Sequence, residues 1–193
     1  MRHFFIFALP QSKIPWLAEF LTYKDWLCLN NISLAMKNVR DLDTMLERPR
    51  IGYADESLAM IWPEIVDRAP SARLVTIRKP VTDVEAEMAQ GGWTDYGNAL
   101  RRIDFALNEI ESLSGTLRID YDKLDTEPTA KRLFEHCLPY PFDREWWNFM
   151  RTKRVEQNPG IIQAAIEHNA HGYVNTFSSA ARYFDKRLAE QRA

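Results

Sequence analysis

Cysteine and glycine are scarce in this sequence. Only 2 of its 193 residues are cysteine and 7 are glycine. Cys28 and Cys137 stand far apart, with no CxxC or Cys/His spacing that could supply four zinc ligands. This excludes a disulfide framework and a zinc-finger class. We interpret both cysteines as buried thiols in a reducing compartment.

Long apolar runs and net charge are also lacking. No apolar stretch approaches the roughly 20 residues of a membrane span, and the longest near the start, 4–10, has the length of a strand. No signal-peptide pattern precedes it, so we expect a cytoplasmic protein with no membrane partner. The formal net charge of −2 leaves anion binding to a local cluster of Lys and Arg, and we expect no nucleic-acid partner.

The composition that remains is that of a globular protein, with 46% hydrophobic and 27% charged residues. A chain of this length buries roughly 70% of its unfolded surface, so it sustains a core without disulfides or structural metal. We therefore predict a single domain over residues 1–193. The part from about 158 to 193 is predicted to be a helical C-terminal extension.

Strand-like and helix-like segments alternate along the chain. The first strand-like run is continuously aromatic and aliphatic, as is typical of a strand buried on both faces of a parallel sheet. Strands are predicted at 2–9, 25–29, 50–54, 72–77 and 116–120. Helices are predicted from Pro15 onward, at 33–46, 56–66, from 81, at 93–113, 126–137, 143–154, and in the last section. This order predicts an α/β fold with right-handed crossovers and a central parallel sheet of about five strands.

The loop after the first strand, 10–15, is a candidate anion site. Free N–H groups and the dipole of the following helix would point toward a ligand there. No glycine lies between Leu9 and Trp16, which excludes a Walker loop and a dinucleotide fingerprint. Ser12 and Lys13 could hold a phosphate or sulfate; the alternative is a polar turn that caps a helix.

Three segments, taken in order, resemble the sulfotransferase family. Residues 9–18, LPQSKIPWLA, resemble its phosphosulfate loop, Pro-Lys/Arg-Ser-Gly-Thr-Thr-Trp-Leu. Residues 72–84, ARLVTIRKPVTDV, resemble the strand and turn that carry the arginine for the ribose phosphate. Residues 117–124, LRIDYDKL, resemble the strand ending in Tyr-Glu-Asp-Leu, and a helix and a Pro-Phe-Asp segment follow as in the family. The resemblance implies a three-layer, P-loop NTPase-like fold in a compact bacterial or phage-like member.

The resemblance also implies roles for four retained residues. Ser12 would contact the phosphosulfate of the cofactor, phosphoadenosine phosphosulfate. Trp16 and Tyr121 would lie near its adenine, and Arg78 would bind its ribose phosphate.

Several family positions carry other residues, so the phosphosulfate loop is degenerate. Gln11 stands where the family has Lys or Arg, and Lys13, in place of the glycine, would return that charge to the phosphosulfate. Ile14 and Pro15 replace two threonines. Each lost hydrogen bond to a charged group removes roughly 1.5–3 kcal/mol. Glu87, near the place of an expected serine, would repel a ribose phosphate if it faced the site.

Sulfuryl transfer needs a general base on the acceptor. Asp55, which follows the third predicted strand, falls close to the position of a catalytic histidine in many sulfotransferases, and Glu56 could serve instead. The alternative is that Asp55 caps the helix at 56–66. Asn30 and Asn31 could hydrogen-bond a substrate but could not take its proton.

Two further groups of side chains have open interpretations. His168 and His171 would share a helical face, but no further metal ligands are found and we predict surface histidines rather than a metal site. The aromatic residues Trp146, Trp147 and Phe149 suit either the core or an apolar acceptor wall.

Two functions from different classes follow. The first is an enzyme that transfers a sulfuryl group from phosphoadenosine phosphosulfate to a small-molecule acceptor with a hydroxyl. Lys13 and Asp55 would be its catalytic residues, and Arg78 would hold the ribose phosphate. The second is a catalytically inactive protein of the same fold that serves as a nucleotide- or anion-binding or protein-interaction module. The four retained residues favour the enzyme, and the glycine-free loop favours the module.

Overall fold

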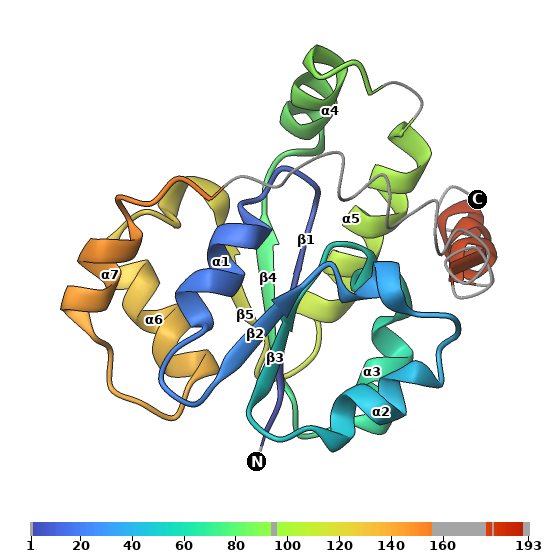
Figure 1. Cartoon of the computed structure of the whole chain (residues 1–193). Coiled ribbons are helices and arrows are strands. Elements are labelled where there is room, and N and C mark those ends of the chain that lie inside the picture. The colour runs from blue at the N-terminus through green and yellow to red at the C-terminus, as the bar shows by residue number, and fades with distance from the viewer. Residues whose placement is uncertain (1, 94–95, 156–176, 179, 191–193) are drawn as a thin grey trace.

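The computed structural model describes residues 2–93, 96–155, 177–178 and 180–190. Its strands form one all-parallel sheet in the order β2-β3-β1-β4-β5 (Figure 1). Their bounds are β1 Phe4–Ala8, β2 Leu27–Asn30, β3 Ile51–Ala54, β4 Arg73–Arg78 and β5 Leu117–Asp120. The predicted α/β class and five-stranded parallel sheet are confirmed.

Strand β1 lies at the centre of the sheet, as its unbroken apolar run predicts. Every residue of Phe4–Ala8 is fully buried. Phe4 is paired with Gly52 on β3 and with Arg73 on β4. The Phe4 ring fills the space beside Gly52, where an added Cβ would lie 2.0 Å from the ring. Only glycine fits at position 52, because the Phe4 ring lies so close to its backbone.

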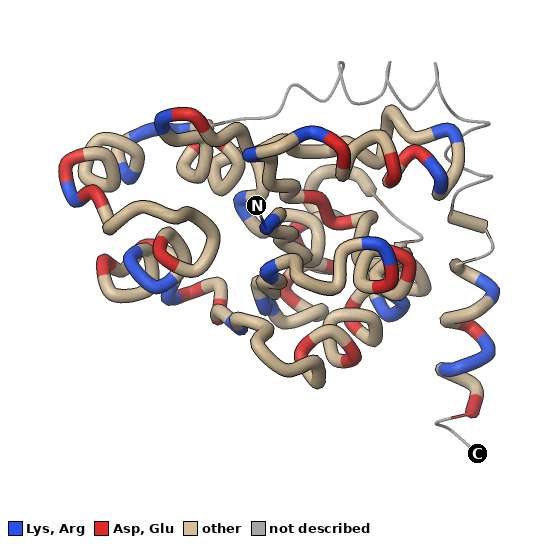
Figure 2. The backbone as a smooth tube through the Cα atoms, turned by 90° about the horizontal axis from the view of Figure 1, so that it is seen from below, with Lys and Arg blue, Asp and Glu red and all other residues tan. Residues whose placement is uncertain are grey.

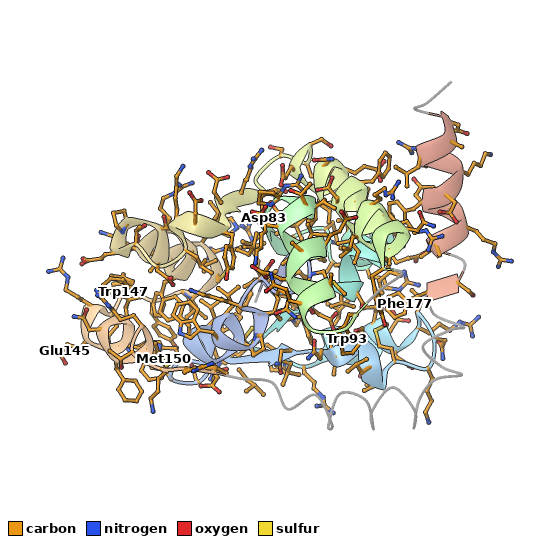
Figure 3. The ribbon with its side chains drawn as sticks, turned by 90° about the horizontal axis from the view of Figure 1, so that it is seen from above. Asp83, Trp93, Glu145, Trp147, Met150 and Phe177 are labelled. Carbon is orange, nitrogen blue, oxygen red and sulfur yellow. The ribbon has the colours of Figure 1, made fainter. Side chains whose placement is uncertain are left out.

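Helices cover both faces of the sheet, which makes three layers. One face packs against α1 (Ile14–Leu21), α6 (Glu127–Cys137) and α7 (Arg144–Met150). The other packs against α2 (Asp41–Glu47), α3 (Trp62–Arg68), α4 (Val81–Gln90) and α5 (Gly97–Glu111). Figure 3 shows Trp147 and Met150 on the side of α7 that faces the molecule, and Glu145 on its outer side.

The single helix predicted at 33–46 is wrong. The structure has a 3-10 turn, η1 (Ile32–Ala35), and then α2. The N–H of Ser33 donates a hydrogen bond of 2.8 Å to the Asp55 carboxylate. Helix α2 then begins at Asp41, whose Oδ2 accepts hydrogen bonds from the N–H groups of Lys37 and Asn38 at 2.6 and 3.2 Å.

Other helix boundaries shift by shorter distances. The helix predicted at 56–66 is a 3-10 turn, η2 (Ser57–Ile61), followed by α3. The helix predicted at 93–113 is α5, and the one predicted at 143–154 ends at Met150. Of the last predicted section, residues 180–190 are helical and 158–176 lie outside the described residues.

The charged residues are distributed without a dominant sign. Figure 2 shows Lys and Arg interspersed with Asp and Glu over the described helices and loops. None of the described helices is both long and apolar enough to cross a membrane.

Candidate functional site

The loop between β1 and α1 turns without glycine. Gln11 and Lys13 adopt left-handed backbone conformations, with φ values of 63° and 57°. Lys13 is the N-cap of α1, and its carbonyl accepts the first helical hydrogen bond, from the N–H of Leu17 at 2.9 Å. The N–H groups of Ile14 and Trp16 lie in the first turn, where helical N–H groups have no intrahelical partner. They are suited to an anion.

Ser12 is buried within this loop, with 1% of its surface exposed. Its Oγ makes no hydrogen bond with any described residue. A buried polar group without a partner costs roughly 1–3 kcal/mol, so such groups are uncommon unless they serve a ligand. An unpartnered hydroxyl at a helix N-terminus is suited to donate to a phosphate or sulfate oxygen.

Lys13 reaches out of the loop toward residues near the end of β5. Its Nζ lies 2.6 Å from Oδ2 of Asp125 and 5.7 Å from the centre of the Tyr121 ring. The structure therefore brings together Lys13 and Tyr121, two residues that the sequence indicated separately. Asp125, which neutralises the lysine, was not anticipated.

Lys79 is a second cation at the loop, and sequence reasoning missed it. Its Nζ donates to the Gln11 carbonyl at 3.3 Å and to Oε2 of Glu87 at 2.5 Å, and lies 4.4 Å from the centre of the Tyr121 ring. The alternation of side chains between the two faces of strand β4 could have identified Lys79. Ile77 faces α1, so a residue two positions later is expected to share that face.

Arg78 lies on the other face of the sheet. Its guanidinium contacts Oδ1 of Asp104 at 2.9 Å, Oε1 of Glu111 at 3.3 Å and Oδ1 of Asn108 at 3.0 Å, all on α5. The structure thus pairs Arg78 with two carboxylates on α5. Its assignment to a ribose phosphate stays a prediction.

Trp16 is part of the core between α1 and α7. Its Nε1 donates to the Met150 carbonyl at 2.9 Å, and its ring stacks on Phe20 with centroids 5.1 Å apart. Only 7% of Trp16 is exposed. Its expected contact with adenine stays a prediction.

Asp55 is buried and its carboxylate is fully engaged. Oδ1 accepts the Ser33 hydroxyl at 3.0 Å and the Ser57 N–H at 2.8 Å, while Oδ2 accepts the Ser33 N–H. Burial raises its pKa, and these hydrogen bonds partly oppose the rise. The contacts tie the turns η1 and η2 to the end of β3.

Glu56 has a different environment. Burial, and then the neighbouring Asp55 carboxylate, raise the pKa of Glu56 to about 8. No other described residue donates a hydrogen bond to its carboxylate. Because Ala54 is paired with Ile6 of β1, Glu56 follows β3 at the same edge of the sheet where β1 enters the anion loop.

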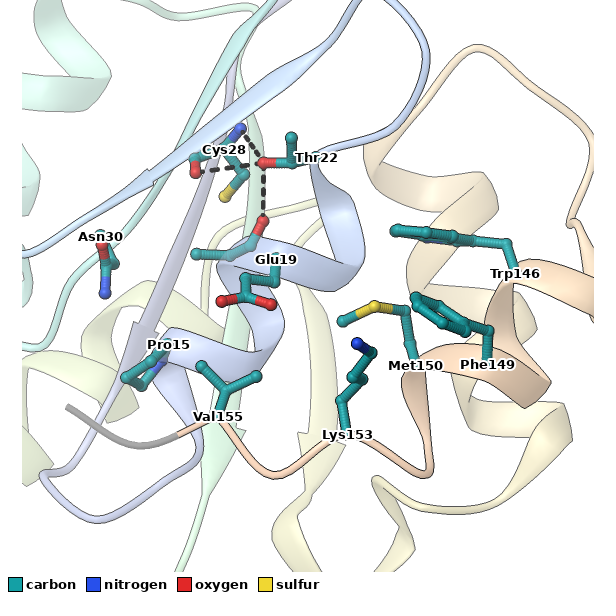
Figure 4. A pocket seen from close by; sticks show the side chains of 11 residues that line it. Pro15, Glu19, Thr22, Cys28, Asn30, Trp146, Phe149, Met150, Lys153 and Val155 are labelled. Atoms are coloured by element: carbon teal, nitrogen blue, oxygen red, sulfur yellow. Dashed lines mark hydrogen bonds between the residues drawn. The ribbon is translucent and has the colours of Figure 1, made fainter.

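A cavity of about 500 Å³ lies along α1 (Figure 4). Its α1 side begins at Pro15, directly after the loop, and the opposite wall comes from α7 and the residues after it. The Trp146 and Phe149 rings stack 5.6 Å apart, and the Lys153 Nζ lies 4.4 Å from the centre of the Phe149 ring. The lining residues are Pro15, Ala18, Glu19, Thr22, Cys28, Asn30, Trp146, Phe149, Met150, Lys153 and Val155.

Polar side chains also line this cavity, namely those of Glu19, Thr22, Asn30 and Lys153. The Glu19 carboxylate has no hydrogen-bond or ion-pair partner among the described residues. Thr22 is engaged, since its Oγ1 donates to the Ala18 carbonyl at 2.9 Å and accepts the Cys28 N–H at 3.0 Å. The cavity therefore combines an apolar, aromatic wall with one free carboxylate.

The cysteines and histidines give no metal centre in the described part of the chain. Both Cys28 and Cys137 are buried, and burial raises the pKa of each thiol. No group of three potential metal ligands occurs among the described residues. His168 and His171 lie outside those residues.

Two solved structures have folds similar to this one. The crystal structure of mouse sulfotransferase SULT7A1 complexed with PAP matches with a TM-score of 0.55 and 14% sequence identity. The match covers 78% of this chain and 64% of the SULT7A1 chain. The sulfotransferase domain from the curacin biosynthetic pathway matches with a TM-score of 0.53 and 12% identity over 98% of both chains. No protein-family model and no curated protein matches the sequence.

Proposed function

We propose, from the premise that this chain has the sulfotransferase fold, that it transfers a sulfuryl group from a nucleotide phosphosulfate to a hydroxyl of a small-molecule acceptor. Phosphoadenosine phosphosulfate is the donor that the sequence resemblance implies. The observation that carries the proposal is the buried, unpartnered Ser12 hydroxyl at the N-terminus of α1. We also propose a cytoplasmic location, which suits two buried reduced thiols.

The residues of the loop fit a phosphate-type anion. Ser12 offers a hydroxyl, and the N–H groups of Ile14 and Trp16 offer donors at the positive end of the helix dipole. The Lys13 ammonium group can exchange its ion pair with Asp125 for one with the ligand. In this role Lys13 neutralises the negative charge that grows on the leaving phosphate.

Glu56 is the better general base of the two neighbouring carboxylates. The donor supplies a sulfuryl group on a phosphate leaving group. As the acceptor oxygen bonds to sulfur and the bond from sulfur to the phosphate oxygen breaks, that electron pair goes to the phosphate, and Glu56 takes the hydroxyl proton. Because its pKa is about 8, Glu56 is mostly protonated at pH 7 and becomes an effective base as the pH rises toward 8, so turnover is expected to increase over that range.

Asp55 then has a positioning role instead of the base role expected from its place in the sequence. Both of its oxygens already accept hydrogen bonds from Ser33 and Ser57. Replacing Asp55 by Asn is expected to disturb η1 and η2 and to lower the stability. Replacing Glu56 by Gln is expected to abolish turnover while leaving nucleotide binding intact.

The body of the acceptor is proposed to bind in the cavity along α1, with its hydroxyl extending past Asn30 toward Glu56, which follows the neighbouring strand β3 and does not itself line the cavity. The cavity wall of Trp146, Phe149 and Met150 suits an aromatic or aliphatic body, and Asn30 at the end of β2 can hydrogen-bond a hydroxyl.

Titration calorimetry with adenosine bisphosphate tests the donor site. Wild type is expected to bind, and Ser12→Ala and Lys13→Met to bind at least about tenfold more weakly, since each loses a contact to a charged group. Lys131→Met is a matched control that removes an exposed lysine on α6, outside both the loop and the cavity. Failure of the wild type to bind either adenosine bisphosphate or adenosine 5′-monophosphate at millimolar concentration would overturn the proposal.

A turnover assay tests the chemistry. With nucleotide present, release of 4-nitrophenol from 4-nitrophenyl sulfate reports sulfuryl transfer onto the nucleotide phosphate. The wild type is expected to release it and Glu56→Gln is not.

One observation favours the second candidate, a nucleotide-binding module without turnover. Both lysines at the loop are paired with carboxylates of the chain, Lys13 with Asp125 and Lys79 with Glu87. Nucleotide binding without 4-nitrophenol release from any of a panel of aryl sulfates would favour this function.

A further inference from the structure

The cations near the anion loop differ in how readily they can meet a ligand. Lys13 and Asp125 form a surface pair, with side chains 38% and 66% exposed. Exposed pairs of this kind contribute little to stability, so a ligand anion can replace Asp125 at small cost. Lys13 is therefore available.

Lys79 is not available in the same way. Its side chain is 5% exposed, and Oε2 of Glu87 lies 2.5 Å from its Nζ. A buried ammonium needs a close counter-charge, and Glu87 provides it from helix α4. A ligand anion approaching Lys79 would meet the Glu87 carboxylate beside it.

Arg78 offers no alternative. Asp104 and Glu111 hold its guanidinium on the opposite face of the sheet, at 2.9 and 3.3 Å. Among the described side chains that contact the loop or Tyr121, the cations are Lys13 and Lys79. The site thus has one cation free to exchange its partner.

We propose that this site takes a nucleotide with one phosphate-type group and that Glu87 discriminates against a nucleotide with a second phosphate. The inference rests on the proposed function and narrows its donor to a nucleoside 5′-phosphosulfate without a ribose phosphate. The sulfuryl acceptor oxygen bonds to sulfur, the bond to the 5′-phosphate oxygen breaks, and a nucleoside monophosphate leaves. A second phosphate gains no free cation, because Lys79 is already paired with Glu87, and it meets the Glu87 carboxylate.

Calorimetric titration with adenosine 5′-monophosphate and adenosine 3′,5′-bisphosphate tests this on the full chain. Wild type is expected to bind the monophosphate at least as tightly as the bisphosphate. Glu87→Gln is expected to tighten the bisphosphate about tenfold or more and to change the monophosphate by less than about threefold. Glu87→Ser provides a second variant, and circular dichroism checks that both are folded.

Glu85→Gln is the matched control, because it removes the same charge from an exposed position of the same helix. It is expected to leave both affinities unchanged. Two outcomes overturn the inference and leave the proposed function standing. In the first, the wild type binds the bisphosphate more than about tenfold more tightly than the monophosphate. In the second, Glu87→Gln leaves the bisphosphate affinity unaltered. Failure of both nucleotides to bind overturns the proposed function and the inference together.

Discussion

Ser12 and Ser33 are buried serines in opposite situations. The Ser12 hydroxyl has no partner, whereas the Ser33 hydroxyl donates to Asp55 at 3.0 Å. Ser12→Ala removes an unsatisfied polar atom, so we expect it to leave the free energy of unfolding unchanged or raised by up to about 1 kcal/mol. Ser33→Ala deprives a buried carboxylate of a donor and is expected to cost about 1–3 kcal/mol. Urea unfolding of both variants measures the difference, and a loss at Ser12 as large as at Ser33 would contradict it.

Glu56 gives the stability a pH dependence whose sign is set by its raised pKa. The folded state holds the Glu56 proton up to about pH 8, while the ordinary value is 4.5. Its contribution to stability is therefore full below pH 4.5 and is lost as the pH rises through 8. Glu56→Gln is expected to unfold at higher urea than the wild type at pH 8 and at the same urea at pH 4. Exposed Glu85→Gln is the control, and an equal shift at both pH values would disprove the effect.

Short sequence motifs selected Ser12, Lys13 and Tyr121, because each follows the end of a strand of the sheet. The structure brings Lys13 and Tyr121 close together, and the binding roles of all three stay predictions. Asp125 could not be found in this way, since its contact with Lys13 joins residues 112 positions apart. Lys79 was overlooked because the motif drew attention to its neighbour on the opposite face.

At the scale of elements, strands were more predictable than helices. Strands β1 and β3 are short runs in which every residue is buried, and burial on both faces dictates the wholly apolar composition of β1 directly. The segment 33–46 has helical periodicity, but Asp55, 22 residues beyond Ser33, accepts the N–H and hydroxyl of Ser33. A tertiary hydrogen bond to a buried carboxylate therefore overrides local propensity.

The packing of β3 on β1 depends on Gly52. An added Cβ would lie 2.0 Å from the Phe4 ring, which is itself fully buried. Gly52→Ala is expected to cost at least about 1–3 kcal/mol. Gly97→Ala in α5 is the control, since its Cβ would meet only the ends of the Glu85 and Arg101 side chains, at 3.3 and 3.5 Å. Chemical denaturation should show a large loss for the first variant and little change for the second.

On the scale of the whole molecule, the C-terminal segment 180–190 is attached to α5 by an apolar contact and by surface charges. Phe184 is fully buried, with its ring 5.9 Å from that of Phe105, whereas Asp185 pairs with Arg102 at an exposed position. Phe184→Ala is expected to cost about 3–5 kcal/mol and Asp185→Asn less than about 1 kcal/mol. Thermal unfolding compares them, and similar losses would show that charge contributes as much as burial.

The strand order has a consequence for how the protein is made on the ribosome. Phe4 at the start of the chain has its sheet partners at Gly52 and Arg73, so β1 cannot be enclosed until both later strands have been synthesised. An emerging chain therefore carries the wholly apolar strand β1 without its partners until synthesis has passed Arg78, the end of β4. Non-local pairing of this kind slows folding and exposes the nascent chain to association. The anion loop, which begins where β1 ends, is completed only after translation has passed Tyr121.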